Sequence, residues 1–214
     1  MKKYFSENEL EQISKAVREA EKTTSAEIVP VFYTSCSDYW ESHCLSGMIV
    51  SLFGSASLVV YNFIYQPWLL SIEIFFLSQL FLILFGILLA YFFPSWRRIF
   101  LNRNEVLTRV QDKAYRVFLE VGLSDTKDKT GILLFMSFFE REAFLITDEG
   151  IRKIISSPIW DGILAQLMLG MKTKNKTEAI INAIDSMGSL LKQIPIQAGD
   201  KNELRDDLRL GDQQ

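Results

Sequence analysis

The sequence contains a single histidine, His43, among 214 residues. A Ser-His-Asp hydrolase needs a free histidine as its general base, and most zinc sites use several nitrogen or sulfur ligands. The phosphate-binding patterns G-x-x-x-x-G-K and G-x-G-x-x-G and the nucleophile pattern G-x-S-x-G are also absent from the sequence. The commonest signatures of nucleotide-binding proteins and serine hydrolases are therefore missing.

Cysteine is also scarce, and basic residues are not in excess over acidic ones. Cys36 and Cys44, with His43 beside the second, have no further ligands at the spacing of a zinc finger. Basic residues after the apolar block 44–93 indicate that both cysteines face the cytoplasm, where disulfides are rare, so we expect two free thiols. The 23 basic side chains against 26 acidic ones give a net charge of −3. Nothing in this balance predicts the concentrated basic face that nucleic-acid binding requires.

Charge is almost absent from residues 44–93, where Glu73 is the single charged side chain. The block contains two apolar runs of 22 residues, 44–65 and 72–93. As helices they would each extend roughly 33 Å, enough to cross a hydrocarbon core of about 30 Å. The intervening residues 66–71 are too few to recross it. We expect a transmembrane helical hairpin; the alternative, a buried soluble hairpin, would show a polar stripe that neither run has.

The orientation of this hairpin follows from basic residues. Residues 66–71, between the two runs, contain no Lys or Arg. The segment after the second run contains five basic residues, Arg97, Arg98, Arg103, Arg109 and Lys113. This asymmetry predicts that both ends of the hairpin face the cytoplasm. Residues 1–20 have the pattern of a polar amphipathic helix and not of a secretory signal. We expect a two-span protein of the inner or plasma membrane with cytoplasmic termini.

The first polar segment, residues 1–43, predicts one helix and one strand. Ser6 and Glu9 fit a capping box at the start of the helix. Residues 27–33 have the apolar composition of a buried strand. Pro30 within it indicates a sheet edge or a bulge, because proline has no N–H to donate.

The second polar segment, residues 94–195, continues with a helix, two strands and two helices. The helix ends at Gly122, the strands cover 131–138 and 142–147, and Ser157-Pro158 has the pattern of a helix start. Residues 196–214 read as a loosely held polar tail.

The two polar segments should join into one domain. The hairpin begins and ends on one side of the membrane, and neither segment has enough strands for a stable sheet. We therefore expect strand 26–33 to lie beside strand 132–138. Helices packed over a small mixed sheet are the natural architecture for these elements, so the fold class is α/β.

Several short segments are similar to a known family: Phe5-Ser6-Glu7, residues 24–30, Thr130-Gly131 with residues 132–135, Phe139-Glu140-Arg141 and Asp148-Glu149-Gly150-Ile151. In these segments the sequence resembles the TPM domain family. The resemblance implies an α/β/α sandwich. It also implies a role like that of family members that assist membrane complexes, or of a line described as an acid phosphatase, with divalent-cation binding in some members. Where the family often has Asp-Asn, this sequence has Lys129-Thr130.

Four acidic residues lie at the ends of predicted strands: Asp125, Asp128, Asp148 and Glu149. Carboxylate oxygens suit Ca²⁺ or Mg²⁺, but acids between elements usually form solvated turns. Lys127 and Lys129 also oppose cation binding. We expect no cofactor; if a cation binds, the resemblance favours Asp128 and Asp148 as its ligands. Glu140-Arg141-Glu142 at the turn between the strands could contact a partner, but we expect a solvated turn.

These features favour an interaction or assembly module for a membrane complex over an enzyme. Its expected partners are the lipid bilayer and a membrane protein, and not nucleic acid. The alternative is a divalent-cation-dependent phosphatase, which would use carboxylates to hold the metal and orient water. That alternative depends on analogy with the family alone.

Overall fold

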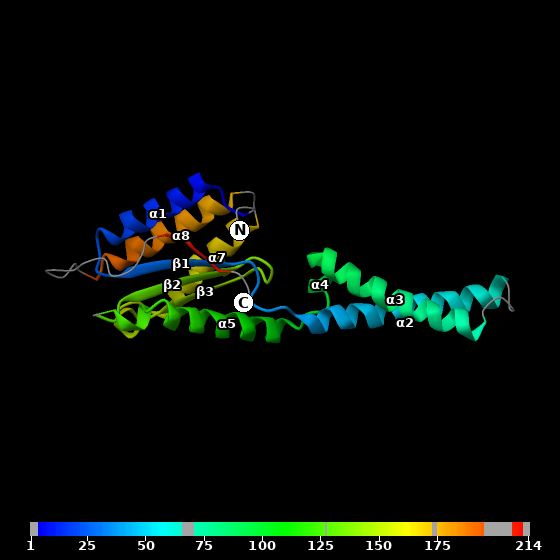
Figure 1. Cartoon of the computed structure of the whole chain (residues 1–214). Helices are drawn as coiled ribbons and strands as arrows, with labels where there is room; N and C mark the ends of the chain where they lie inside the picture. Colours follow the sequence, from blue (N-terminus) through cyan, green and yellow to red (C-terminus); the bar gives the residue numbers. More distant parts are fainter. Residues whose placement is uncertain (1–3, 66–70, 127, 173–174, 195–206, 212–214) are drawn as a thin grey trace. The chain divides into compact units, whose positions relative to one another are not determined.

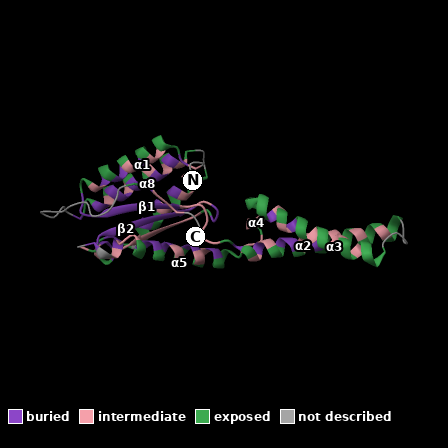
Figure 2. Cartoon of the chain, in the orientation of Figure 1, coloured by how far each residue is buried: buried purple, intermediate pink, exposed green. Residues whose placement is uncertain are grey.

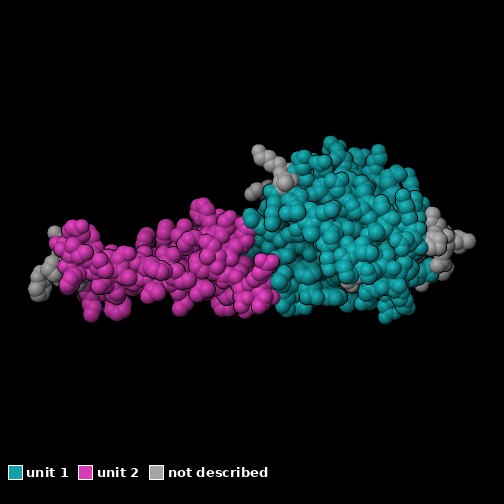
Figure 3. Space-filling view, turned by 180° about the vertical axis from the view of Figure 1, so that it is seen from behind, with its two compact units in different colours: residues 1–36, 107–214 teal, residues 37–106 magenta. Residues whose placement is uncertain are grey.

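The structure, a computed structural model, describes residues 4–65, 71–126, 128–172, 175–194 and 207–211, except for the side chains of Asp125 and Ser157 (Figure 1). The chain forms two compact units (Figure 3). One contains residues 1–36 and 107–214, and the other contains residues 37–106. The second unit is longer than the predicted block 44–93, because its first helix begins at Trp40 and a short helix, α4 (Pro94–Arg98), follows the hairpin.

The first helix, α1 (Glu7–Glu21), begins with the predicted capping box. The Glu9 N–H donates to Ser6 Oγ at 3.3 Å, and the Ser6 N–H donates to Glu9 Oε2 at 2.7 Å. Two N–H groups that have no partner within the helix are thereby satisfied. The apolar face of α1 is buried through Ile13 and Val17.

A four-stranded mixed sheet lies at the centre of the first unit, in the order β3-β2-β1-β4. The strands are β1 (Glu27–Tyr33), β2 (Gly131–Ser137), β3 (Glu142–Thr147) and β4 (Arg209–Gly211). β1 and β2 are parallel and pair along their whole length, from Glu27 opposite Gly131 to Tyr33 opposite Ser137. β3 is antiparallel to β2, and β4 is parallel to β1. The predicted pairing of strand 26–33 with strand 132–138 is confirmed.

Helices cover both faces of this sheet (Figure 1). Three lie on one face: α1, α7 (Ser157–Met171) and α8 (Lys176–Leu191). The other face is covered by α5 (Arg103–Glu120). Side chains of β1 alternate between the two layers, so that Ile28 and Phe32 belong to the core under α1 and α8, while Lys113 of α5 lies 4.9 Å from the Tyr33 ring centroid. Strands buried on both faces have continuous apolar sequences. The unit is the expected α/β/α sandwich.

Pro30 lies on the edge of β1 that faces away from β2. The Glu27 N–H donates towards β2, to Thr130 O, whereas the Ile28 N–H donates to Glu21 Oε1 at 2.7 Å. Because N–H groups alternate in direction along a strand, residue 30 lies on the same edge as Ile28. β4 covers this edge only at residues 31–33. β1 is thus an interior strand in the sheet order and not the edge strand that Pro30 indicated. Among the described residues its outer edge is unpaired at residue 30, so the missing proline N–H removes no ladder hydrogen bond.

Residues 207–211, the described part of the C-terminal segment, differ from the prediction of a loosely held tail, and its other residues lie outside the described ones. Of its described residues, Arg209–Gly211 form β4, and Leu208 just before them is only 5% exposed and belongs to the core. The polar composition of this segment gave no strand signal. The strand forms because the backbone of β1 supplies its hydrogen-bond partners.

Three short helical turns and one boundary were not predicted. They are α4, a 3-10 turn η1 (Leu123–Asp125) and α6 (Glu149–Arg152). The N-cap of α7 is Ser156 and not Ser157, so Pro158 is the second residue of the helix. Proline is tolerated there, since the first-turn N–H groups have no partner within a helix.

The second unit is a hairpin of α2 (Trp40–Tyr65) and α3 (Ile72–Phe92), and most of the predicted connection, residues 66–70, lies outside the described residues. Both helices are long and apolar enough to cross a membrane. Only 17% and 6% of their most apolar stretches are buried, so the helix surfaces are mainly exposed (Figure 2). Ser46 Oγ donates to Gly86 O at 2.8 Å, and Ser51 Oγ donates to Gln79 Oε1 at 2.5 Å. These contacts fix an antiparallel pair.

Candidate functional site

The carboxylate of Glu140 lies in the turn between β2 and β3 and is only 8% exposed. Its Oε1 accepts hydrogen bonds from the Cys36 N–H at 2.7 Å and from Ser35 Oγ at 3.2 Å. Its Oε2 accepts one from Ser137 Oγ. Glu140 therefore joins the segment after β1 to the end of β2, and the prediction of a solvated turn is wrong for this residue.

Long-range backbone contacts explain the burial of Glu140. The Phe139 N–H donates to Thr34 O at 3.0 Å, which places the turn against the chain leaving β1. Arg141 has φ of 57° and reverses the chain into β3. A buried carboxylate is costly unless donors surround it, and the donors here come from both strand ends. The arrangement stabilises the carboxyl ends of β1 and β2.

Cys36 lies against this carboxylate as a free thiol. Burial, and next the charge of Glu140, raise the pKa of Cys36 to about 12. The thiolate is the nucleophilic form of cysteine, and the raised pKa keeps Cys36 in the thiol form at neutral pH. Cys44 is also free and is exposed on α2.

The predicted cation ligands lie at the opposite end of β2. Asp148 is 8% exposed and caps α6, where its Oδ1 accepts from the Glu149 N–H at 2.7 Å. Its Oδ2 is buried and has no hydrogen-bond partner among the described residues. The loop carrying Asp128 comes close to the start of α6, because the Gly150 N–H donates to Lys129 O at 2.9 Å.

The loop with Asp128 and the start of α6 with Asp148 lie close together, but they do not form a complete set of metal ligands. The described residues include no group of three His, Cys, Asp or Glu side chains that could hold a metal ion. Glu149 is exposed, Lys127 lies outside the described residues, and Lys129 Nζ donates to Ser124 O at 2.6 Å. Asp128 and Asp148 therefore remain predicted ligands.

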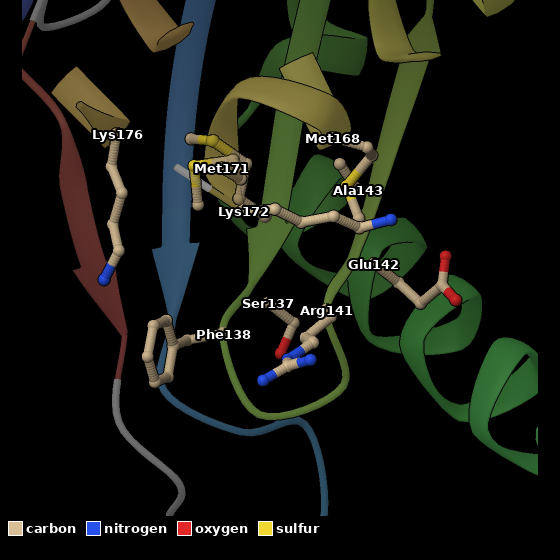
Figure 4. A pocket seen from close by; sticks show the side chains of 10 residues that line it. Ser137, Phe138, Arg141, Glu142, Ala143, Met168, Met171, Lys172 and Lys176 are labelled. Atoms are coloured by element: carbon tan, nitrogen blue, oxygen red, sulfur yellow. The ribbon is translucent and has the colours of Figure 1, made fainter. Parts of the chain in front are cut away.

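A cavity of about 250 Å³ lies between the β2–β3 hairpin and the end of α7 (Figure 4). Its apolar lining consists of Met136, Phe138, Ala143, Met168 and Met171. Its polar lining consists of Ser137, Arg141, Glu142, Lys172 and Lys176. The sequence did not predict this cavity, because its walls come from three separate segments whose spacing carries no common pattern.

The fold defines the class of protein as an α/β/α sandwich whose sequence is interrupted by an apolar helical hairpin. The TPM domain profile matches residues 101–190, from the start of α5 to the end of α8. Residues 101–190 therefore carry a TPM domain, as the resemblance indicated. Because β1 pairs with β2 throughout, the sandwich also includes the segment before the hairpin.

One solved structure with the same fold is the NMR structure of BA42 protein from the psychrophilic bacterium Bizionia argentinensis. It aligns with a TM-score of 0.59 and 18% identity, covering 97% of this chain and 96% of that one. At this identity the likeness concerns the fold alone. None of the curated proteins compared with the sequence matches it.

Proposed function

We propose that this protein is a membrane-anchored TPM domain that serves as an interaction or assembly module for a membrane complex. The observation that carries the proposal is the position of the hairpin between two paired strands. β1 precedes α2, β2 follows α3, and the strands pair along their whole length. Since a sheet cannot form across a bilayer, both ends of the hairpin lie on the same side.

The exposed surface of the hairpin supports insertion into lipid. Phe63 and Ile72 are 83% and 74% exposed, and many other large apolar side chains of α2 and α3 are also exposed. Soluble monomers rarely expose contiguous apolar patches of more than a few hundred Å². Lipid chains would remove this surface from water, and the hydrogen bonds Ser46–Gly86 and Ser51–Gln79 would satisfy polar groups within the hairpin.

The side of the membrane follows from the residues after the hairpin. Arg97 and Arg98 end the short helix α4, and α5 adds Arg103, Arg109 and Lys113. Basic residues near span ends favour the cytoplasmic side. We therefore place the sandwich in the cytoplasm, at the inner or plasma membrane.

A binding role is favoured over the phosphatase alternative by the state of the polar side chains. Glu140 is engaged by three donors, and Cys36 is protonated at neutral pH. A general base or nucleophile must reach a reacting atom in an accessible site. Neither side chain meets that requirement, and the part of the chain that the structure describes has no group of three His, Cys, Asp or Glu side chains for the metal that the phosphatase alternative needs. The phosphatase alternative is therefore not favoured.

Membrane insertion and sidedness can be tested on the full chain. The protein should stay in the membrane pellet after alkaline carbonate extraction. A fluorescent-protein fusion at the C-terminus should be bright, and an alkaline-phosphatase fusion there inactive. Active phosphatase at the C-terminus would reverse the orientation, and release by carbonate would overturn the anchor.

The interaction role requires a separate test in native membranes. A photo-crosslinking residue at Leu119, 63% exposed on α5, samples one face of the sandwich, and one at Lys22 samples the end of α1. We expect a defined membrane-protein adduct from one position and not from the other. No adduct from either, together with monomeric migration in native electrophoresis, would contradict the interaction role.

A cation at Asp128 and Asp148 is a further part of the proposal that calorimetry can test. The unpaired Asp148 Oδ2 supports it, because a buried carboxylate oxygen without a donor is costly. If the site binds, titration with Ca²⁺ or Mg²⁺ should give heat that Asp128→Asn and Asp148→Asn abolish. Binding that survives both substitutions would show that other residues are the ligands.

A further inference from the structure

We propose that the cavity between the β2–β3 hairpin and α7 binds a small aliphatic carboxylate, an anion with an apolar chain of about eight carbons. This inference concerns the sandwich alone and does not depend on the proposed membrane role. The evidence for this inference is that one part of the cavity lining is apolar and another part is cationic.

The apolar part is formed mainly by methionine. Met168 and Met171 come from the last turn of α7, and Met136 comes from the end of β2. Figure 4 shows the Met168 side chain close to Ala143 of the β2–β3 hairpin. Methionine side chains are flexible and polarisable, and they adapt to apolar guests of varying shape. This part of the lining suits an alkyl chain.

The cationic part contains three positive side chains, Arg141, Lys172 and Lys176, against the single carboxylate of Glu142. Lys176 Nζ lies 4.3 Å from the Phe138 ring centroid and 5.8 Å from that of Tyr4. Aromatic faces attract an ammonium group without neutralising its charge. Among the described parts of the chain, neither Arg141 nor Lys172 forms an ion pair. The cavity therefore has an excess of positive charge for one anionic group.

The volume limits the size of the ligand. A cavity of about 150 Å³ can hold benzene, and pockets for drug-sized ligands range from about 300 Å³ upwards. At about 250 Å³ the cavity lies between these cases. Inorganic phosphate would leave the methionines without a partner, and an uncharged alcohol would leave the cations without one. A medium-chain carboxylate satisfies both parts.

The test uses the full chain in lipid nanodiscs, because detergent would compete for an apolar cavity. With ¹³C-labelled methionine methyl groups, titration with octanoate should shift Met168 and Met171. Met187 is fully buried in α8, outside the lining, and should stay unchanged. Acetate, inorganic phosphate and octanol serve as probes of the anionic and apolar parts alone, and each should bind at least tenfold more weakly.

Paired variants separate the cavity from a general charge effect. Arg141→Gln with Lys172→Gln should weaken octanoate binding at least tenfold. The control, Arg152→Gln with Lys153→Gln, removes the same two charges from an exposed site outside the lining and should leave binding unchanged. Equal weakening by both pairs, phosphate binding as tight as octanoate binding, or no methyl shift at millimolar octanoate would each overturn the proposal.

Discussion

Glu140 and Cys36 are 104 residues apart in the sequence, yet the Cys36 N–H donates to Glu140 Oε1 at 2.7 Å. The hairpin of α2 and α3 lies between these residues in the sequence. Their contact connects the chain just before the hairpin with the turn after β2. The Glu140 carboxylate thus stabilises the joint between the two sequence segments of the sandwich.

Glu140→Gln should lower the free energy of unfolding by about 2 kcal/mol, because charged hydrogen bonds are lost and an amide N–H₂ faces donors instead of acceptors. Thermal denaturation followed by circular dichroism would measure the change. The control is Glu11→Gln on the exposed surface of α1, where we expect a change within about 0.5 kcal/mol. Equal effects of the two substitutions would contradict the conclusion that the Glu140 carboxylate stabilises the sandwich.

Cys36 should resist thiol reagents at neutral pH. In a Cys44→Ser background, where Cys36 is the only thiol, its alkylation rate should stay low at pH 9 and rise only towards pH 12. The cause is burial, together with the Glu140 charge, which raise the pKa of Cys36 to about 12. Rapid alkylation of the folded protein at pH 8 would contradict this environment.

The raised pKa of Cys36 also has a consequence for stability. Above the ordinary thiol pKa of 9.0, the unfolded chain loses this proton while the native protein keeps it. The contribution of Cys36 to the free energy of unfolding is therefore constant below pH 9 and falls as the pH rises towards 12. Cys36→Ala should show a shallower loss of stability over that range.

The features that the sequence predicted well depend on local or strongly apolar patterns. The capping box of Ser6 and Glu9 involves residues three apart, so its contacts follow from spacing alone. The pairing of β1 with β2 followed from two apolar runs that needed each other for burial. The hairpin helices followed from length and composition.

The features that the sequence did not predict depend on long-range contacts between polar segments. Glu140 is a charged residue in a turn, and its burial follows from the position of residues 34–36. β4 has three residues, and its hydrogen bonds depend on the edge of β1 after Pro30, which no other strand occupies among the described residues. The lining of the cavity comes from β2, β3 and both ends of the α7–α8 connection. The hydrophobic periodicity within one segment cannot predict contacts between segments that are far apart in the sequence.

Glu9 should make the stability of the sandwich depend on pH in the acidic range. Hydrogen bonds from the Ser6 N–H and the Ser6 hydroxyl, followed by one from the Thr177 hydroxyl, lower the pKa of Glu9 below 4.5. Because the native pKa is the lower one, the stabilisation is fully present above about pH 4.5 and is lost as the pH falls through the native value.

The measurement compares the wild type with Glu9→Gln at pH 7 and at pH 3 by thermal denaturation. The stability difference should be larger at pH 7 and smaller at pH 3, because below pH 4.5 the unfolded chain takes up the proton that the native carboxylate resists. Ser6→Ala should cost about 1 kcal/mol at pH 7 through loss of the cap. A stability difference between wild type and Glu9→Gln that does not change with pH would rule out the ionised carboxylate as its source.

Gly211→Ala should displace β4 from the sheet. A methyl group at Gly211 would lie 2.1 Å from Cζ of Tyr33, far inside van der Waals contact. β4 pairs with β1 only at residues 31–33, so few hydrogen bonds oppose its release. By the alternation described for β1, the Phe32 N–H faces β4. Release of β4 should therefore speed hydrogen exchange at Phe32 about tenfold or more.

The matched control is Gly162→Ala in α7, where an added methyl group has open space within 4 Å. It should leave exchange at Phe32 unchanged, and alanine should favour the helix there. Exchange at Leu133, in the centre of β2, should stay slow in both variants because β1 and β3 flank that strand. Unchanged protection of Phe32 in Gly211→Ala would mean that Tyr33 moves aside and that β4 remains paired. Loss of protection at both Phe32 and Leu133 would indicate instead that β4 is required for the whole sheet.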